Sequence, residues 1–171
     1  ESDGAEDSTD QVTVTMTDTY GDGWCKLGNC ACITLTPGDA DCLTLGDGFE
    51  TTVEVDVPTD TCVAWYYDPP AIGASEVGFE LTLNGQTATG GGGGAQVGVF
   101  GDDDVCGATP CARCVSAGGF YCGDDTSNWS STIENGCVPP VWINDGWADC
   151  VDGSDESGAP PPTIHTCDAE S

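Results

Sequence analysis

Apolar and polar residues alternate along much of the first hundred positions, which is the pattern of β-strands with one buried face. Valines and a methionine alternate with threonines over residues 12–17, and three valines alternate with polar residues over 53–57. Further strand candidates lie at residues 33–35, 61–67, 77–83 and 95–100. Turn signals such as Asn84-Gly85 separate them, and no segment shows a helical period. We therefore predict an all-β fold, an antiparallel β-sandwich with a jelly-roll-like arrangement.

The pattern changes near residue 106, where the alternation ends and cysteine-rich, turn-rich sequence begins. This change predicts two small units, the second being a disulfide-rich module. The predicted divisions are an acidic tail over residues 1–10, a β-sandwich over 11–106, a linker over 107–113, the module over 114–156 and a proline-rich tail over 157–171.

Composition narrows the functional classes. Twelve cysteines in 171 residues indicate an oxidising compartment, and the start at Glu1 without a methionine is typical of a mature secreted chain. Thirty acidic residues against Lys26 and Arg113 give a formal charge of −28, which excludes nucleic-acid binding and disfavours anionic membranes. No apolar run reaches the roughly 20 residues of a membrane span. Asn128 begins an Asn-Trp-Ser sequon, so we predict an extracellular glycoprotein.

Acidic residues near the C-terminus have a specific spacing. Four of them follow Trp142 at intervals of three, seven, thirteen and fourteen positions. This segment resembles a low-density-lipoprotein receptor class A repeat, a family in which two carbonyls and four carboxylates bind Ca²⁺. The resemblance implies the ligands Trp142 (carbonyl), Asp145, Trp147 (carbonyl), Asp149, Asp155 and Glu156. The alternative is an acidic, turn-rich surface segment.

The same resemblance implies two disulfides, Cys114–Cys137 and Cys122–Cys150. The chain departs from the family at Asn144, where the family has a cysteine, and the next available cysteine is Cys167. One family bridge is therefore missing or rerouted. Connectivity of the other cysteines does not follow from sequence, and Cys62–Cys106 and Cys111–Cys167 are suggestions only.

The segment TDTYGDGW, residues 17–24, directly follows the first predicted strand. It resembles a GDGW-type β-sandwich module of secreted algal, oomycete and marine bacterial proteins, in which a glutamate and an aromatic strand follow later. Part of an EF-hand-like ligand pattern is also present. The candidate ligands of a second metal site are Asp18, Asp22, Trp24 (carbonyl) and Glu76. The alternative is a tight Asp/Gly turn that closes one end of the sandwich.

Catalysis is not expected, because the single histidine, His165, lies in the proline-rich tail. The acidic tails, the dense cysteines and the lack of a recognisable sugar site favour a calcium-stabilised structural or adhesive subunit of an extracellular assembly. Such an assembly is a surface filament, flagellar hair or cell-wall layer of a protist or alga. We expect self-association or binding to other matrix or filament proteins, with residues 1–17 able to add to a neighbour's sheet or to pair within their own. The alternative function is a soluble binding module for basic protein ligands or glycans.

Overall fold

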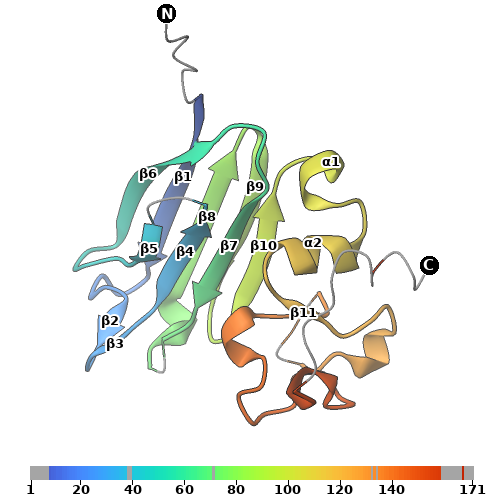
Figure 1. Cartoon of the computed structure of the whole chain (residues 1–171). Helices are drawn as coiled ribbons and strands as arrows, with labels where there is room; N and C mark the ends of the chain where they lie inside the picture. Colours follow the sequence, from blue (N-terminus) through green and yellow to red (C-terminus); the bar gives the residue numbers. More distant parts are fainter. Residues whose placement is uncertain are drawn as a thin grey trace, which may run out of the picture.

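The computed structural model describes residues 8–37, 40–70, 72–131, 133, 135–158 and 167 (Figure 1). It is mostly β-structure in antiparallel sheets, as the alternating pattern predicts, and six disulfides join the twelve cysteines. The strands of the two large sheets are β1 (Thr9–Asp18), β4 (Cys32–Thr36), β5 (Ala40–Leu43), β6 (Glu50–Pro58), β7 (Val63–Asp68), β8 (Val77–Leu83), β9 (Gln86–Gly91) and β10 (Gln96–Phe100). Two short ladders consist of β2 (Cys25–Lys26) with β3 (Asn29–Cys30), and of β11 (Phe120–Tyr121) with β12 (Cys137–Val138).

The eight longer strands form two four-stranded sheets, in the orders β6-β1-β8-β9 and β10-β7-β4-β5. Their alternating residues explain how the sheets pack. The apolar residues of β1 are buried while the threonines between them are partly exposed, so the strand turns one face inward. Both sheets contribute to one hydrophobic core, whose largest fully buried side chains are Trp24, Tyr67, Met16, Ile33, Leu35 and Leu81.

Strand β1 is central in its sheet and pairs with strands of its own chain on both sides. It pairs with β6 over its length, from Thr9 opposite Pro58 to Thr17 opposite Glu50, and with β8 from Thr13 to Asp18. The strand thus begins at Thr9, two residues before the predicted boundary at residue 11, and residues 1–7 of the predicted tail lie outside the described residues. In this structure β1 therefore pairs within its own sheet.

Part of the predicted linker, residues 107–113, is helical and partly buried, although the sequence shows no helical period. Helix α1 (Asp103–Cys106) follows β10, and helix α2 (Pro110–Ser116) spans part of residues 107–113. Thr109 accepts a hydrogen bond from the Ala112 N–H and Pro110 occupies the first turn, which together explain why α2 begins there. Short 3₁₀ segments are η1 (Ala74–Glu76), η2 (Thr126–Asn128), η3 (Pro140–Trp142) and η4 (Ser154–Glu156). Helices of this length are too short to show a period.

Disulfides hold together the part of the chain that follows β10, called the C-terminal part below, and attach it to the sheets. The pairs are Cys25–Cys30, Cys32–Cys42, Cys62–Cys106, Cys111–Cys167, Cys114–Cys137 and Cys122–Cys150. Cys114–Cys137 and Cys122–Cys150 are the pairs that the class A resemblance implies. Cys111–Cys167 reaches across the proline-rich stretch, of which residues 159–166 lie outside the described residues.

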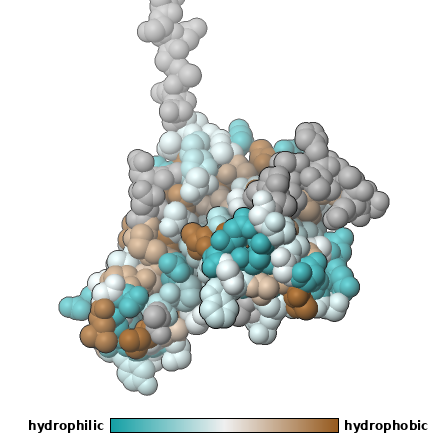
Figure 2. Space-filling model, turned by 60° about the horizontal axis from the view of Figure 1, so that its bottom comes forward, coloured by the Kyte–Doolittle hydropathy of each residue, from teal (hydrophilic) through white to brown (hydrophobic). Residues whose placement is uncertain are grey.

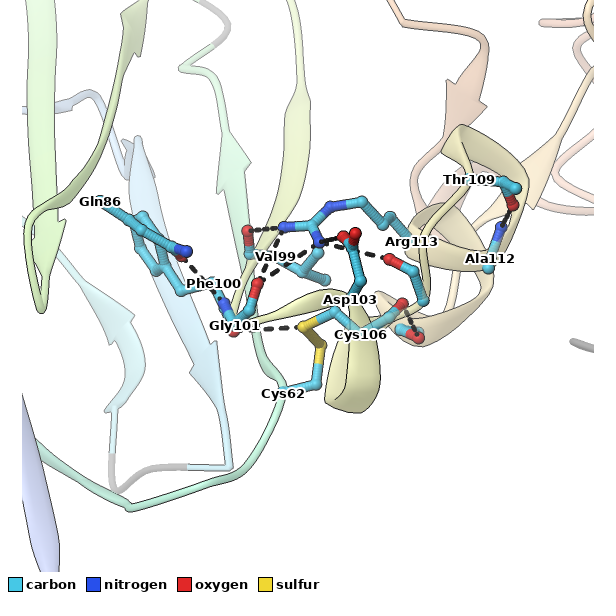
Figure 3. A network of polar contacts seen from close by, with 12 residues as sticks. Cys62, Gln86, Val99, Phe100, Gly101, Asp103, Cys106, Thr109, Ala112 and Arg113 are labelled. Carbon is cyan, nitrogen blue, oxygen red and sulfur yellow. Dashed lines mark hydrogen bonds and ion pairs between the residues drawn. A yellow bond between two sulfur atoms is a disulfide. The ribbon is translucent and has the colours of Figure 1, made fainter.

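The C-terminal part also covers the edge of β10 (Figure 3). Residues 97, 99 and 101 lie at alternate positions, and each of their carbonyls accepts a side-chain hydrogen bond. Asn135 donates to the Val97 carbonyl at 3.3 Å, and Arg113 donates to the carbonyls of Val99 at 3.3 Å and Gly101 at 3.4 Å. Side chains of this part thus occupy the place of a further strand.

The Arg113→Met variant should weaken the attachment of α2 to β10, because it removes a charged donor to three backbone carbonyls, including that of Gly107. We expect a loss of about 1–2 kcal/mol in the free energy of unfolding, measured by denaturant titration. Asp103→Asn is the matched control, since it removes only the 3.8 Å ion pair of an exposed aspartate. An equal loss in both variants would show that the ion pair, and not the carbonyl contacts, holds the helix.

Candidate metal site

Three carboxylates meet at one end of the first large sheet. One oxygen each of Asp18, Asp22 and Glu76 lies within 4.8 Å of the others, and this is the only group of three or more potential metal-ligating side chains found among the described residues. Asp18 ends β1, Asp22 lies in the following turn, and Glu76 ends η1 directly before β8. These are three of the four residues predicted for the second metal site.

Strand register and two glycine turns bring the three residues together. Asp18 stands opposite Val77 in the β1–β8 ladder, and the Thr19 N–H donates to the Glu76 carbonyl at 3.0 Å. The Gly48 N–H donates to the Gly21 carbonyl at 2.9 Å, which joins the two GDG segments. Gly21 and Gly23 have φ values of +78° and +83°, a backbone conformation that favours glycine. The GDG repeats are therefore turns that position Asp22 beside the sheet.

The buried carboxylates are only partly satisfied. Asp18 is 2% exposed, and its Oδ1 accepts hydrogen bonds from the N–H groups of Tyr20 at 2.8 Å and Gly21 at 2.7 Å. Its Oδ2 is buried without a hydrogen-bond partner, and so is Oε2 of Glu76. A buried carboxylate oxygen without a partner is costly, and buried charges in proteins are paired or bind metals. These two oxygens are suited to accept a cation.

Lys26, in the β2–β3 hairpin, supplies part of the positive charge. Its Nζ lies 3.2 Å from Oδ2 of Asp22 and also contacts Oε1 of Glu76. The hydrogen bond to Glu76, followed by the contacts with Asp22, raises the pKa of Lys26 above 10.5 despite the opposing effect of desolvation. Three carboxylates and one ammonium carry a formal charge of −2, which a divalent cation would neutralise.

Trp24, the fourth predicted ligand, has hydrogen-bond partners for both its carbonyl and its indole, and cation binding by its carbonyl stays a prediction. Its carbonyl accepts a hydrogen bond from the Ala31 N–H at 2.9 Å, within the loop that contains β2 and β3. The indole is buried, donates to the Thr17 carbonyl at 2.9 Å and meets Tyr67 edge-on. Trp24 therefore anchors the loop of the candidate site to the core through its side chain.

The predicted C-terminal ligands are arranged as acceptors for their own loop. Asp155 is 1% exposed, and its two oxygens accept the N–H groups of Asp149 at 3.0 Å and Cys150 at 3.1 Å. Glu156 similarly accepts the N–H groups of Asp145 and Gly146. Although all four predicted acids are described, they do not form a group like that of Asp18, Asp22 and Glu76. Cation binding by this set stays a prediction.

The other predicted ligands and the glycosylation site also have local partners. Trp142 ends η3, whereas the Trp147 side chain is largely exposed and its N–H donates to Oδ1 of Asp145 at 2.9 Å. Asn128 donates through Nδ2 to the Cys122 carbonyl at 2.9 Å and accepts the Asp152 N–H at 2.8 Å. The sequon amide is thus tied into the folded module, and glycosylation of Asn128 stays a prediction.

Comparisons with known proteins found no matching family model, no matching curated protein and no matching solved structure. Both family resemblances therefore rest on the residues quoted above. No helix among the described residues is long and apolar enough to cross a membrane.

The effect of pH on the stability that Lys26 contributes to the fold follows from the raised pKa of this side chain. A base with a higher pKa in the folded state stabilises the fold below its unfolded pKa and loses that contribution as pH rises through the folded value. In chelator, the stability difference between wild type and Lys26→Met should stay constant to about pH 10.5 and then shrink. Denaturant titrations at increasing pH measure it.

Lys26→Arg is the control for this prediction, because arginine keeps its charge at these pH values. Its stability difference from Lys26→Met should not shrink in the same window. A wild-type difference that already falls near neutral pH would contradict the ion pairing with Asp22 and Glu76.

Proposed function

We propose that this protein is a calcium-stabilised structural subunit of an extracellular assembly, with its cation held by Asp18, Asp22 and Glu76. The observation that carries the proposal is the pair of buried, unpartnered oxygens, Oδ2 of Asp18 and Oε2 of Glu76, in a group with a formal charge of −2. A cation there would join the end of β1 to the residue before β8. Its binding would therefore stabilise the central ladder of one sheet.

Calcium is the cation that best fits these donors. They are carboxylate oxygens, which hard cations prefer, and Ca²⁺ takes six to eight oxygen ligands, so backbone carbonyls or water would complete its coordination. Mg²⁺ requires a tighter octahedral arrangement and keeps several waters. Zinc favours histidine and cysteine, whereas the described cysteines are all in disulfides. We therefore assign the site to Ca²⁺.

Two further features suit a durable extracellular subunit. Six disulfides in 171 residues are typical of small secreted domains that resist unfolding. The two large sheets and their shared core support classification of the N-terminal part as a β-sandwich, and its jelly-roll-like arrangement stays a prediction. We propose no catalytic activity, and His165 lies outside the described residues.

Charge limits how such subunits associate. A formal charge of −28 makes two copies repel each other, so close contact needs bound cations or a basic partner. On the face that Figure 2 shows, hydrophobic residues form small patches separated by hydrophilic ones. The second candidate function, a module that binds basic protein ligands, is favoured by a groove beside β9 that is described below.

Calcium should raise the melting temperature of the wild-type protein, and the increase should be lost in Asp18→Asn and Glu76→Gln. At calcium concentrations 100-fold above Kd, ligand linkage gives about 2.7 kcal/mol of stabilisation. Asparagine at position 18 can still accept the N–H groups of Tyr20 and Gly21, so this variant should fold. Scanning calorimetry in calcium and in chelator is the measurement.

Asp149→Asn is the matched control, because it changes an acid of the C-terminal set and leaves the first site unchanged. It should keep the calcium response. The opposite result, a response kept in Asp18→Asn but lost in Asp149→Asn, would move calcium to the C-terminal module. That result would overturn the site proposed here and support the class A resemblance.

The assembly role predicts that calcium promotes association of the full chain. Size-exclusion chromatography with light scattering should show larger species in millimolar-range calcium, with their share rising with protein concentration. Asp22→Asn removes one negative charge from the site at an exposed position, so it should reduce the calcium-dependent association. A strict monomer at every concentration would contradict self-assembly and leave the binding-module function.

A further inference from the structure

Strand β9 has an open hydrogen-bonding edge. It is the last strand of its sheet and pairs only with β8. The β8–β9 hairpin turns at Asn84 and Gly85, both with positive φ, which is the two-residue turn in which the flanking residues form a hydrogen-bonded pair. Counting from that pair, Thr87 and Thr89 direct their N–H and C=O groups away from β8. Among the described residues, no backbone partner meets these groups.

A groove runs beside this open edge. A cavity of about 640 Å³ lies between Gln86, Thr87 and Ala88 of β9, strand β10 and helix α2. A second cavity of about 590 Å³ continues past Thr89 and Gly91. The two cavities share Trp65, Val97, Asn135 and Cys137 in their walls. The groove is therefore extended along β9, and it has the size range of ligand sites in proteins.

The opposite wall of the groove is the edge of β10, whose outward carbonyls are already used. The outward carbonyls of β10 already accept hydrogen bonds from Asn135 and Arg113. Gln86 bridges the two sheets at one end, where its Oε1 accepts the Gly101 N–H at 3.0 Å. An extended segment in the groove would thus find backbone carbonyls not already used by side chains on the β9 side, which favours pairing with β9.

The end of the groove near Gln86 is acidic. It is surrounded by Arg113 and by three aspartates, Asp102, Asp103 and Asp104. The Arg113 guanidinium already donates to backbone carbonyls and forms an ion pair with Asp103. The three aspartates are exposed, and one arginine leaves a local formal charge of −2. A second copy of this chain, with its charge of −28, is a poor match for that end. A segment with lysine or arginine is a good match.

We propose that the groove between β9 and α2 binds an extended basic segment of a partner protein, which adds to the sheet as a strand beside Thr87 and Thr89. Backbone hydrogen bonds give affinity in this mode of binding, and alternate side chains give specificity. A lysine or arginine at one end of the segment contacts Asp102–Asp104. The inference rests on the proposed role in an assembly and names the chemistry of the partner, but it does not require the calcium site.

The test uses the full chain and a short fluorescent peptide in which valine and threonine alternate after an end of lysines. Binding is followed by fluorescence anisotropy. Thr87→Pro removes an N–H that faces the groove, at an edge position where proline is tolerated, and should weaken binding about tenfold or more. Thr87→Val keeps the backbone donor and should bind as the wild type does.

The matched control is Thr52→Pro on β6, the other edge strand of the same sheet. The β1–β6 ladder is fixed by two hydrogen bonds, from the Asp18 N–H to the Phe49 carbonyl and from the Thr59 N–H to the Ser8 carbonyl. In this register the backbone N–H and C=O groups of Thr52 also point away from the neighbouring strand. Thr52→Pro should leave peptide binding unchanged. An equal loss in both proline variants, or no loss in Thr87→Pro, would overturn strand addition at β9.

Two peptide variants keep the proposal testable if Thr87→Pro does not fold. N-methylation of alternate backbone nitrogens should abolish binding, and glutamates in place of the lysines should weaken it strongly. The double variant Asp102→Asn/Asp104→Asn should reduce the preference for lysine. Unchanged binding of the N-methylated or glutamate peptide overturns the proposal, and so does a Thr87-dependent dimer of the chain without peptide.

The calcium response of Asp18→Asn is a separate measurement, so failure of peptide binding is distinguishable from failure of the metal site.

Discussion

Open edges of β-sheets are the constraint on which the rest of this structure depends. A four-stranded sheet exposes unpaired backbone groups along both outer strands, and such edges promote unwanted pairing with other chains. In this protein the C-terminal part covers the β10 edge, where Asn135 and Arg113 occupy three successive outward carbonyls. The disulfide Cys62–Cys106 fixes the chain at the point where it leaves the sheets for the helices. The two parts of the chain are therefore one packing unit at this edge.

Scarcity of positive charge makes the two cationic residues structurally important. Lys26 lies among Asp22 and Glu76, and Arg113 lies between α2 and β10, so each joins segments distant in sequence. Neither is left free to neutralise the surface, whose other charges are almost all negative. Further neutralisation must come from outside the chain, as metal ions or basic partners. The proposed calcium site and the proposed binding of a basic segment in the groove are two consequences of the same charge imbalance.

Strands and their buried faces could be predicted from sequence because period-two alternation is a direct result of sheet geometry, as in β1 and β8. The short helices could not, since seven residues of α2 give no measurable period, although Thr109-Pro110 is a helix-start signal. Of the two predicted metal sites, the one whose carboxylates come together in this structure depends on register: Asp18 lies close to Glu76 because Asp18 stands opposite Val77. The spacing of Asp145 to Glu156 predicts ligands equally well, yet backbone N–H groups satisfy Asp155 and Glu156. The spacing of acidic residues alone does not distinguish a metal ligand from a carboxylate that accepts hydrogen bonds from its own loop.

The candidate metal site and the groove lie on the same sheet and are connected through β8. Glu76 directly precedes β8, and β8 pairs with β1 on one side and with β9 on the other. The proposed cation between Asp18 and Glu76 would hold the end of the β1–β8 ladder and so limit fraying of the strand that supports β9. At the same end, Gly91 is tied back by Gln96, whose Oε1 accepts its N–H at 3.2 Å. The open edge at Thr87 and Thr89 is thus bounded by the Asn84-Gly85 turn and by this contact, so only its middle is available for pairing. This limits a docked strand to a short segment and makes the charges at its end important for specificity.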